Sequence, residues 1–291
     1  WAADPNIFSV YSGYVFKLIH KCTLIQNVND LWPEEGNSLG LFKSRLLYNI
    51  ARSYTKGAFH LSDIVTVTSP AYSNHISHYY GIAKSKFYFL PVGVGDNFDS
   101  NKNDVKSKSF IILYIGSLSI AYDFEIVLNA AKSFLSYENV FFMIIGKGEE
   151  ANRINEIIKS NDLTNVIFIN RFYDNHNIKY IINAASLTLL PLKIPHYRGI
   201  STKLFEYQAL GKPIVCISDG IAATYVTKTK SGIVVNPRDV EGLVNSILMY
   251  YNNPQLIKKM GDNGKKVVNK HYKYDHISKK LITYLQINNY V

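Results

Sequence analysis

The stretches SFIILYIG at residues 109–116 and VFFMIIGKG at residues 140–148 each lead a run of apolar, β-branched and aromatic residues into a glycine turn. An amphipathic stretch at residues 123–135 separates them, with its apolar residues at helical spacing. A strand, a helix and a second strand in this order predict a parallel sheet that is covered by helices. These forty residues therefore indicate an α/β fold.

The same alternation continues along the rest of the chain. After residue 148 it predicts strands at 166–170, 187–192, 213–217 and 232–235, with helices at 149–160, 175–184 and around residue 206. Six strands in this order fit one doubly wound domain. The first hundred residues predict buried strands at 23–28 and 64–68, a third apolar run at 87–92, and helices at 41–56 and 69–80. A polar stretch at 97–107 is the best linker, which predicts one domain over residues 1–99 and another over 100–291.

Length and composition agree with a packed two-domain protein. The chain has 291 residues, of which 47% are hydrophobic and 19% are charged, and this balance excludes a disordered or collagen-like chain. No stretch approaches the roughly 18 apolar residues of a membrane span, and the first residues lack the pattern of a signal peptide. We therefore expect an intracellular protein that does not span a membrane. Two distant cysteines, Cys22 and Cys216, are expected to be buried free thiols.

Positive charge is concentrated near the C-terminus. The net charge is +10, and residues 258–280 hold eight lysines against Asp262 and Asp275. Apolar residues recur between these lysines at roughly helical spacing, which favours a basic helix with a solvated face. Contact with an anionic lipid surface is the alternative. The basic residues match no recognised nucleic-acid module, so we expect no nucleic-acid partner.

A second informative stretch is RGISTKLFEYQALGKPIV at residues 198–215. It predicts a loop and a short helix that Ser201 caps and Gly211 ends, followed by a strand that opens at Pro213. The free amides at the start of such a helix suit a phosphate group. Glu206 lies about one turn inside the helix and could accept hydrogen bonds from ribose hydroxyls. The alternative is an exposed glutamate on an ordinary helix.

This stretch resembles the signature region of the retaining GT-B glycosyltransferases of family 4, also called glycosyl transferases group 1. It is most similar to the branch that makes capsular, O-antigen and colanic-acid polysaccharides. The matching residues are Ser201, Lys203, Phe205, Glu206, Tyr207, Ala209, Gly211, Lys212 and Pro213. Asn29–Glu34 (NDLWPE) resembles the D-x-W-P-E loop of that branch, and Leu90–Val94 (LPVGV) resembles the start of its interdomain linker. The resemblance covers nearly the whole chain.

The resemblance implies two Rossmann-like lobes of doubly wound parallel sheet that face a cleft. Because the chain reaches the D-x-W-P loop already at Asp30, we expect its first lobe to be incomplete and the N-terminus to be truncated. The first lobe would hold the acceptor and the second the donor. Asp30 would either orient the acceptor or cap a helix. The residues implied in donor binding are Gly116, Ser117, Arg171, Ile200, Ser201, Thr202, Lys203 and Glu206, with Glu206 on the ribose and the amides of residues 200–202 on the pyrophosphate.

The chain departs from the family pattern at three positions. Arg198 stands where the first glutamate of the spaced pair is expected, and Ser117 and Tyr122 stand on or near the positions of the Arg and Lys that face the pyrophosphate in many members. We expect Arg198, Lys203 and Arg171 to supply positive charge instead.

Three weaker patterns receive the ordinary interpretation. Gly146–Gly148 is interpreted as a strand-end turn, because it lacks a full phosphate-loop pattern. His196 is interpreted as a surface loop residue that could touch substrate. His75 and His78 have no further metal-ligating residues at ligand spacing, so no metal site is expected.

The function implied is transfer of a hexose from a nucleotide-diphosphate sugar to a glycan or lipid-linked acceptor, with retention and with neither a metal nor a cofactor. The enzyme would be cytoplasmic, with the basic segment 258–280 holding it at the inner membrane face. The alternatives are a non-catalytic or degenerate nucleotide-sugar-binding subunit and a GT-B-like sugar-nucleotide epimerase.

Overall fold

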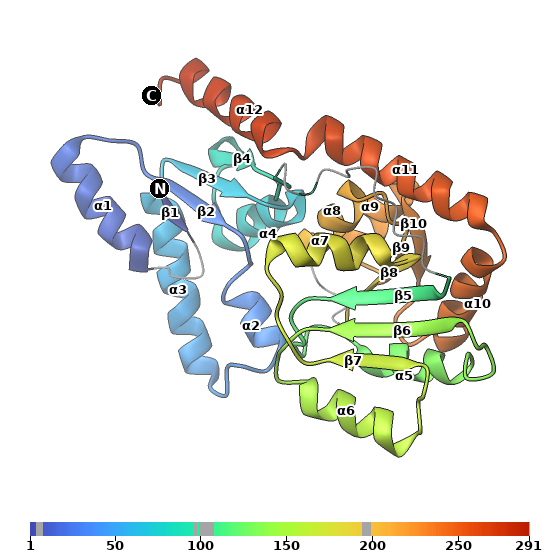
Figure 1. Ribbon diagram of the computed structural model, residues 1–291. Coiled ribbons are helices and arrows are strands. Elements are labelled where there is room, and N and C mark those ends of the chain that lie inside the picture. Colours follow the sequence, from blue (N-terminus) through green and yellow to red (C-terminus); the bar gives the residue numbers. More distant parts are fainter. Residues whose placement is uncertain (4–7, 96–97, 99–107, 194–198, 291) are drawn as a thin grey trace. The chain divides into compact units, whose positions relative to one another are not determined.

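A computed structural model describes residues 1–3, 8–95, 98, 108–193 and 199–290. The chain divides into two compact units. The first comprises Trp1–Val92, Tyr197–Ile200 and Asp275–Val291, and the second comprises Gly93–His196 and Ser201–Tyr274. Each unit contains a parallel sheet with helices packed on it (Figure 1).

The second unit contains all six strands that the sequence predicts. They are β5 (Phe110–Ile115), β6 (Val140–Ile145), β7 (Val166–Ile169), β8 (Leu187–Pro191), β9 (Ile214–Ile217) and β10 (Gly232–Val235). Their order in the sheet is β10-β9-β8-β5-β6-β7, and all neighbours are parallel. The chain winds outward from β5 to one edge and then returns to β8 beside β5, with Ile112 level with Leu187. The β5–β8 boundary is therefore the topological switch point of a doubly wound sheet.

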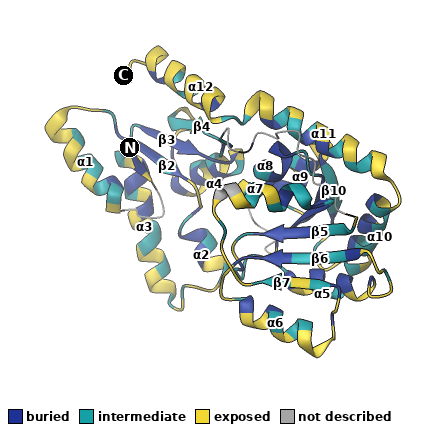
Figure 2. Ribbon diagram, in the orientation of Figure 1, coloured by how far each residue is buried: buried dark blue, intermediate teal, exposed yellow. Residues whose placement is uncertain are grey.

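Helices connect these strands and extend the unit. They are α5 (Phe124–Lys132), α6 (Ala151–Ser160), α7 (Asn175–Ala184), α8 (Thr202–Ala209), α9 (Ile221–Thr229), α10 (Val240–Tyr251) and α11 (Pro254–His271). The Asp123 carboxylate caps α5 by accepting a hydrogen bond from the Ile126 amide at 3.2 Å. Helices cover both faces of the sheet, so the central strands are buried on both sides (Figure 2). This is why they are continuous apolar runs in the sequence.

The first unit is built around a smaller parallel sheet. Its strands are β1 (Ala2–Ala3), β2 (Ile25–Val28), β3 (Ile64–Val67) and β4 (Phe87–Phe89), paired in that order. The helices are α1 (Phe8–His20), α2 (Glu34–Ser38), α3 (Arg45–Leu61), α4 (Pro70–Tyr80), the short 3-10 helix η1 (Lys84–Lys86) and α12 (Tyr274–Ile287). Strand β1, helices α1 and α2, and the 3-10 helix η1 are not among the predicted elements. Phe59, Tyr72 and Ile76 form part of a core against β2 and β3.

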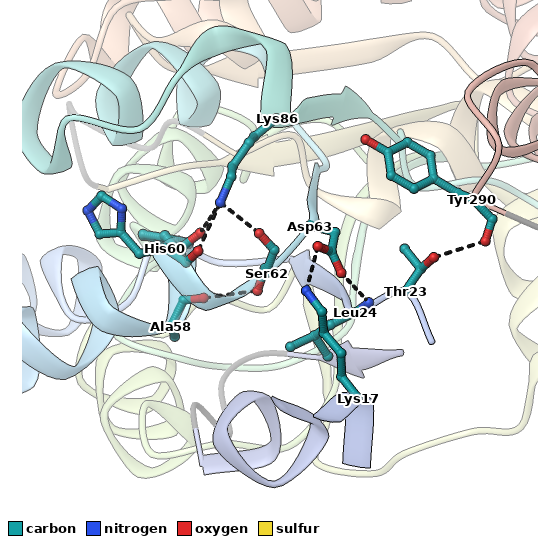
Figure 3. Close-up of polar contacts among 10 residues, drawn as sticks. Lys17, Thr23, Leu24, Ala58, His60, Ser62, Asp63, Lys86 and Tyr290 are labelled. Carbon is teal, nitrogen blue, oxygen red and sulfur yellow. Dashed lines mark hydrogen bonds and ion pairs between the residues drawn. The ribbon is translucent and has the colours of Figure 1, made fainter. Parts of the chain in front are cut away.

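The C-terminal helix belongs to the first unit, which differs from the predicted division at residue 100. Leu285 of α12 packs on Ile25 and Ile64, and the Thr23 hydroxyl donates to the Tyr290 carbonyl at 2.9 Å (Figure 3). The basic segment 258–280 therefore divides between α11 and α12, which lie in different units. Six of its eight lysines are exposed and two are half-buried, as expected for solvated helix faces. The predicted linker at 97–107 lies almost entirely outside the described residues.

The cysteine prediction is correct for one residue only. Cys216 is buried in β9, and burial raises the pKa of its thiol to about 12. Cys22 is exposed, because it follows the end of α1 at the surface, so the prediction of a buried thiol is wrong there. Among the helices that the structure describes, none combines the length and the apolarity that crossing a membrane requires.

Lys86 closes the C-terminal end of α3. Its ammonium donates to the carbonyl oxygens of His60 at 2.9 Å and Ser62 at 2.8 Å (Figure 3). A cation at this end of a helix satisfies terminal carbonyls and complements the helix dipole. Lys86→Met is expected to lower the free energy of unfolding of the first unit by about 1–2 kcal/mol. Urea titration followed by tryptophan fluorescence measures this, because Trp1 and Trp32 are the two tryptophans of the chain and both lie in the first unit.

The neighbouring Lys84 supplies the control for this prediction. Lys84 is exposed and belongs to the same short helix, so Lys84→Met removes the same charge without removing the cap. We expect no change for this variant. An equal loss in both variants would show that net charge, and not the cap, stabilises the unit.

Candidate active site at the switch point of the second unit

Two glycine turns lie in contact at the carboxyl ends of β5 and β6. Gly116 follows β5 with φ +140°, and Gly146 follows β6 with φ +159°. A Cβ atom on Gly146 would lie 1.7 Å from the Gly116 carbonyl oxygen, and the Leu118 amide donates to the Lys147 carbonyl at 2.8 Å. Only glycine allows this approach. The interpretation of Gly146–Gly148 as a strand-end turn is therefore confirmed.

Lys203 brings a positive charge to the turn that follows β5. It lies in the first turn of α8, and its aliphatic chain crosses Gly116 so closely that a Cβ there would lie 2.0 Å from Lys203 Cε. Its ammonium donates to the Tyr122 hydroxyl at 2.9 Å and lies 5.7 Å from the centre of the Tyr114 ring. The cation is thus held at the switch point, where open α/β sheets bind their ligands.

Three tyrosines hold Lys203 and the turn after β5 in place through hydrogen bonds and ring contacts. The Tyr114 hydroxyl donates to the Ser117 carbonyl at 2.5 Å, and the Tyr114 and Tyr122 rings meet edge to face at 5.3 Å. The Tyr207 hydroxyl accepts from the Ile115 amide and donates to the Ile115 carbonyl, each at 3.3 Å. Burial raises the pKa values of Tyr114 and Tyr207, so both hydroxyls stay neutral hydrogen-bonding groups at physiological pH.

The start of α8 lies beside this lysine. Ser201 is the N-cap residue as predicted, but its side chain makes no capping hydrogen bond, so that part of the prediction is wrong. The first-turn amides of Thr202 and Lys203 therefore have no hydroxyl cap and suit an anion. The helix ends as predicted, with Gly211 at φ +67°.

Glu206 lies one turn beyond Lys203, on the same face of α8. Desolvation raises the pKa of its half-buried carboxyl, and the charge of Lys203 opposes that shift. The alternative of an exposed glutamate does not hold, because Glu206 is half-buried. Its place beside a cation allows a carboxylate to stay ionised there.

The structure brings together only part of the predicted donor set. Gly116, Ser117, Ser201, Thr202, Lys203 and Glu206 lie around β5 and α8. Arg171 follows the edge strand β7, which β6 separates from β5, and its guanidinium lies 5.1 Å from the centre of the Tyr173 ring. Ile200 is half-buried and precedes the α8 cap. Arg198 and His196 lie outside the described residues.

Tyr114, Tyr122 and Tyr207 are site residues that the sequence reasoning missed. It treated Tyr122 as the loss of a cation, whereas the structure shows that its hydroxyl holds the Lys203 ammonium. Tyr207 lies inside the 198–215 stretch, directly after Glu206, so the sequence could have indicated it as a site residue.

In the first unit, Asp30 follows β2 and is exposed. Pro33, not Asp30, occupies the N-cap position of α2, so the helix-capping alternative is wrong. The role of Asp30 toward an acceptor stays a prediction. His75 lies 3.7 Å from Glu34, and His78 meets the Tyr79 ring. Within the described part of the chain, no group of three or more His, Cys, Asp and Glu side chains is arranged to hold a metal ion.

Comparison with known proteins decides the family. A sequence model of the family described as "Glycosyl transferases group 1" matches residues 96–267, more than half of the chain. The chain belongs to the glycosyl transferases group 1 family.

Solved structures show the fold of this group 1 glycosyltransferase chain. Alr3699/HepE of Anabaena, solved in complex with UDP, superposes with a TM-score of 0.80 at 16% identity, covering 98% of this chain and 78% of that one. Sucrose-phosphate synthase of Thermosynechococcus elongatus gives a TM-score of 0.78 at 18% identity, covering 98% and 73%. The predicted α/β architecture of the GT-B class, with two parallel-sheet domains, is thus confirmed.

Curated relatives match a smaller share of their own length. The 2-deoxystreptamine N-acetyl-D-glucosaminyltransferase of Niallia circulans is 23% identical over 150 residues, which is 51% of this chain and 38% of that protein. The O-antigen chain mannosyltransferase C of Escherichia coli is 22% identical over 185 residues, which is 63% of this chain and 45% of that protein. The group 1 chain therefore spans less than half the length of these relatives.

Proposed function

We propose that this chain binds a nucleotide-diphosphate sugar at the β5–β8 switch point of its second unit and transfers the hexose to a glycan or lipid-linked acceptor. The observation that carries the proposal is the Lys203 ammonium, held over Gly116 beside the start of α8. Family membership and the O-antigen mannosyltransferase relative support sugar transfer in cell-surface polysaccharide synthesis. The Anabaena structure that contains UDP supports a nucleotide ligand for this fold.

In the proposed mechanism, the second unit stabilises the departing diphosphate. Lys203 and the first-turn amides of α8 would face the negative charge that develops on the leaving group. Glu206 would accept hydrogen bonds from the ribose hydroxyls and so fix the nucleotide. In this proposal, no step uses a metal or a cofactor. Arg198 would add a second cation.

The remaining steps of the proposal follow from the family resemblance. Transfer would retain the anomeric configuration, as in family 4 and its polysaccharide branch. Asp30 of the first unit would orient the acceptor hydroxyl. The reaction would take place in the cytoplasm, where the acceptor is presented at the inner face of the membrane.

An alternative is nucleotide-sugar binding without transfer, or epimerisation of the sugar nucleotide. Ser117 supports this alternative, because it is exposed and neutral near a position where many family members carry a cation. Lys203 argues against it, because it supplies the missing charge from α8. Release of nucleoside diphosphate that depends on an added acceptor distinguishes transfer from both alternatives. Tight binding without turnover indicates a binding subunit, and isomerised donor indicates an epimerase.

Lys203→Ala tests the proposed donor site. The variant is expected to weaken binding of the nucleotide sugar about tenfold or more, since a charge-assisted hydrogen bond contributes roughly 1.5–3 kcal/mol. The measurement is calorimetric titration with the donor that gives the largest thermal shift in a nucleotide-sugar panel. Tyr122→Phe keeps the ring but releases the ammonium, and it should weaken binding by a smaller factor.

Lys228→Ala is the matched control, because Lys228 is an exposed lysine of α9 in the same unit. It should bind the donor as the wild type does. Unchanged affinity in Lys203→Ala would show that the donor lies elsewhere.

A further inference from the structure

Helix α11 packs directly on α8, the helix that carries the proposed donor-binding side chains (Figure 1). The contact is made through glycines of α11. A Cβ atom on Gly261 would lie 1.9 Å from the carbonyl oxygen of Gly211, and one on Gly264 would lie 2.8 Å from Gln208 Cγ. Both α11 glycines are buried, and they lie three residues apart on one face of the helix. The Gly261 contact is with backbone that cannot rotate away, so only glycine allows α11 to come this close to the end of α8.

Gln208 ties α8 to the segment between α9 and β10 through a buried amide. The residue is fully buried, its Nε2 donates to Ser231 Oγ at 2.7 Å, and its Oε1 accepts from the Tyr225 hydroxyl at 3.3 Å. The Ser231 hydroxyl lies 2.8 Å from the hydroxyl of Thr229. An amide side chain donates and accepts at different atoms, so these two bonds fix the rotation of α8 about its own axis.

An aromatic cluster holds the same side of α8. The Phe205 ring is 1% exposed, and its centre lies 4.6 Å from that of Tyr272, which directly follows α11, and 5.7 Å from that of Tyr225. At about 100° per residue, Phe205 and Gln208 lie roughly half a turn around α8 from Lys203. The side of α8 that carries Lys203 is therefore held in place by contacts on the opposite side of the helix.

We propose that α11 positions α8 for donor binding, with Gly261 and Gln208 as the positioning residues. Neither residue touches the donor. They fix where the Lys203 ammonium and the Glu206 carboxylate lie relative to the turn after β5. Hydrogen bonds weaken steeply with distance and angle, so a displacement of α8 by about 1 Å removes a large part of the donor affinity. The inference rests on the proposed function, because the position of α8 matters to the donor only if Lys203 and Glu206 bind it.

Gly261→Ala tests the proposal on the full chain. The new Cβ must push α11 and the end of α8 apart, so the variant should weaken donor binding about tenfold or more without removing any group that contacts the donor. The measurement is calorimetric titration with the nucleotide sugar that gives the largest thermal shift in a panel of UDP-, GDP-, ADP- and dTDP-sugars. Hydrogen exchange of peptides within residues 202–215 should show that α8 is still folded.

Gln208→Met is the second variant, because it keeps the length of the side chain and removes both hydrogen bonds. It should weaken donor binding about threefold or more. If Gly261→Ala does not fold, Gln208→Met decides the question by the same measurement.

A double-mutant cycle with Lys203→Ala separates positioning from a general loss of stability. Two substitutions that act through the same group are not additive. In the Lys203→Ala background, Gly261→Ala or Gln208→Met should weaken donor binding by at most about threefold and by less than in the wild type, because the ammonium that it displaces is already absent. An equal factor in both backgrounds would overturn the proposal, since the substitution would then act on the unit as a whole.

Leu243→Ala is the control for stability. Leu243 is fully buried in α10, so its truncation destabilises the same unit, and it belongs to neither α8 nor α11. We expect it to bind the donor as the wild type does, and an equal loss in this control would overturn the proposal. Unchanged affinity in Gly261→Ala and Gln208→Met, with the usual loss in Lys203→Ala, would overturn the positioning role alone. Unchanged affinity in Lys203→Ala would overturn the donor site and this inference with it.

Discussion

Glu34→Gln is expected to lower the free energy of unfolding of the first unit by about 2–3 kcal/mol at neutral pH. The Glu34 side chain is only 9% exposed and accepts a hydrogen bond from the Tyr80 hydroxyl. Arg52 Nε and His75 Nε2 lie 3.5 and 3.7 Å from the same oxygen. The other carboxylate oxygen has no hydrogen-bond partner among the described residues. The glutamine amide would lack the negative charge that pairs with Arg52. It would also bury its N–H groups at the position of the carboxylate oxygen that has no hydrogen-bond partner.

The effect should depend on pH. Desolvation alone would raise the pKa of Glu34, but the neighbouring His75 and the Tyr80 hydroxyl lower it below its usual value of 4.5. A carboxyl whose pKa is lowered by folding stabilises the protein above its unfolded pKa and loses that contribution as the pH falls. The wild type should therefore lose stability below about pH 4.5 more steeply than Glu34→Gln does. Urea titration at several pH values, followed by tryptophan fluorescence, measures both.

Glu35→Gln is the control for this cluster. Glu35 is half-buried and accepts a hydrogen bond from the Tyr72 hydroxyl at 2.9 Å, outside the Arg52 and His75 pairs. Its expected cost is about 1 kcal/mol or less. If both variants lost the same stability with the same pH dependence, the buried cluster would contribute nothing particular to the first unit.

The strands were predictable because parallel strands are buried on both faces and leave continuous apolar runs in the sequence. Helix α1 was not predictable in the same way. Its sequence FSVYSGYVFKLIH is apolar on two sides, so it lacks the polar face that marks a surface helix. The place of α12 also escaped prediction, because its packing on Ile25 and Ile64 joins segments more than 200 residues apart. Local sequence patterns reflect neighbours along the chain and carry no information on such distant contacts.

The candidate site was likewise predictable where its signals are local and unpredictable where it depends on contacts between distant residues. The α8 segment and the glycine after β5 were visible, because helix ends and strand-end turns have local signatures. The bond between Lys203 and Tyr122 spans 81 positions, and no local pattern announces it. When each family position is compared with a single residue of this chain, Tyr122 counts as the loss of a cation. In the structure, the positive charge comes from Lys203 in α8, and Tyr122 accepts a hydrogen bond from it.

Gly146→Ala should have the largest effect on the second unit, with a loss of at least about 3 kcal/mol in its free energy of unfolding. Its φ of +159° disfavours a side chain, and the new Cβ would lie 1.7 Å from the Gly116 carbonyl oxygen. That oxygen belongs to the backbone and cannot rotate away. The β5 and β6 turns must therefore separate, which breaks the bond from the Leu118 amide to the Lys147 carbonyl. Hydrogen exchange of peptides that span residues 108–125 measures the loss, and donor binding should fall with it.

Gly211→Ala separates backbone strain from steric contact. Gly211 also has a positive φ, +67°, but a Cβ there would meet nothing closer than 3.8 Å. The expected cost is about 1 kcal/mol, the strain of an alanine in the left-handed region. Protection of the β5 turn should be unchanged, because Gly211 lies at the far end of α8. If Gly146→Ala lowered the free energy of unfolding no more than Gly211→Ala does, the turns after β5 and β6 would not be in contact. Residues other than Gly116 and Gly146 would then have to position Lys203.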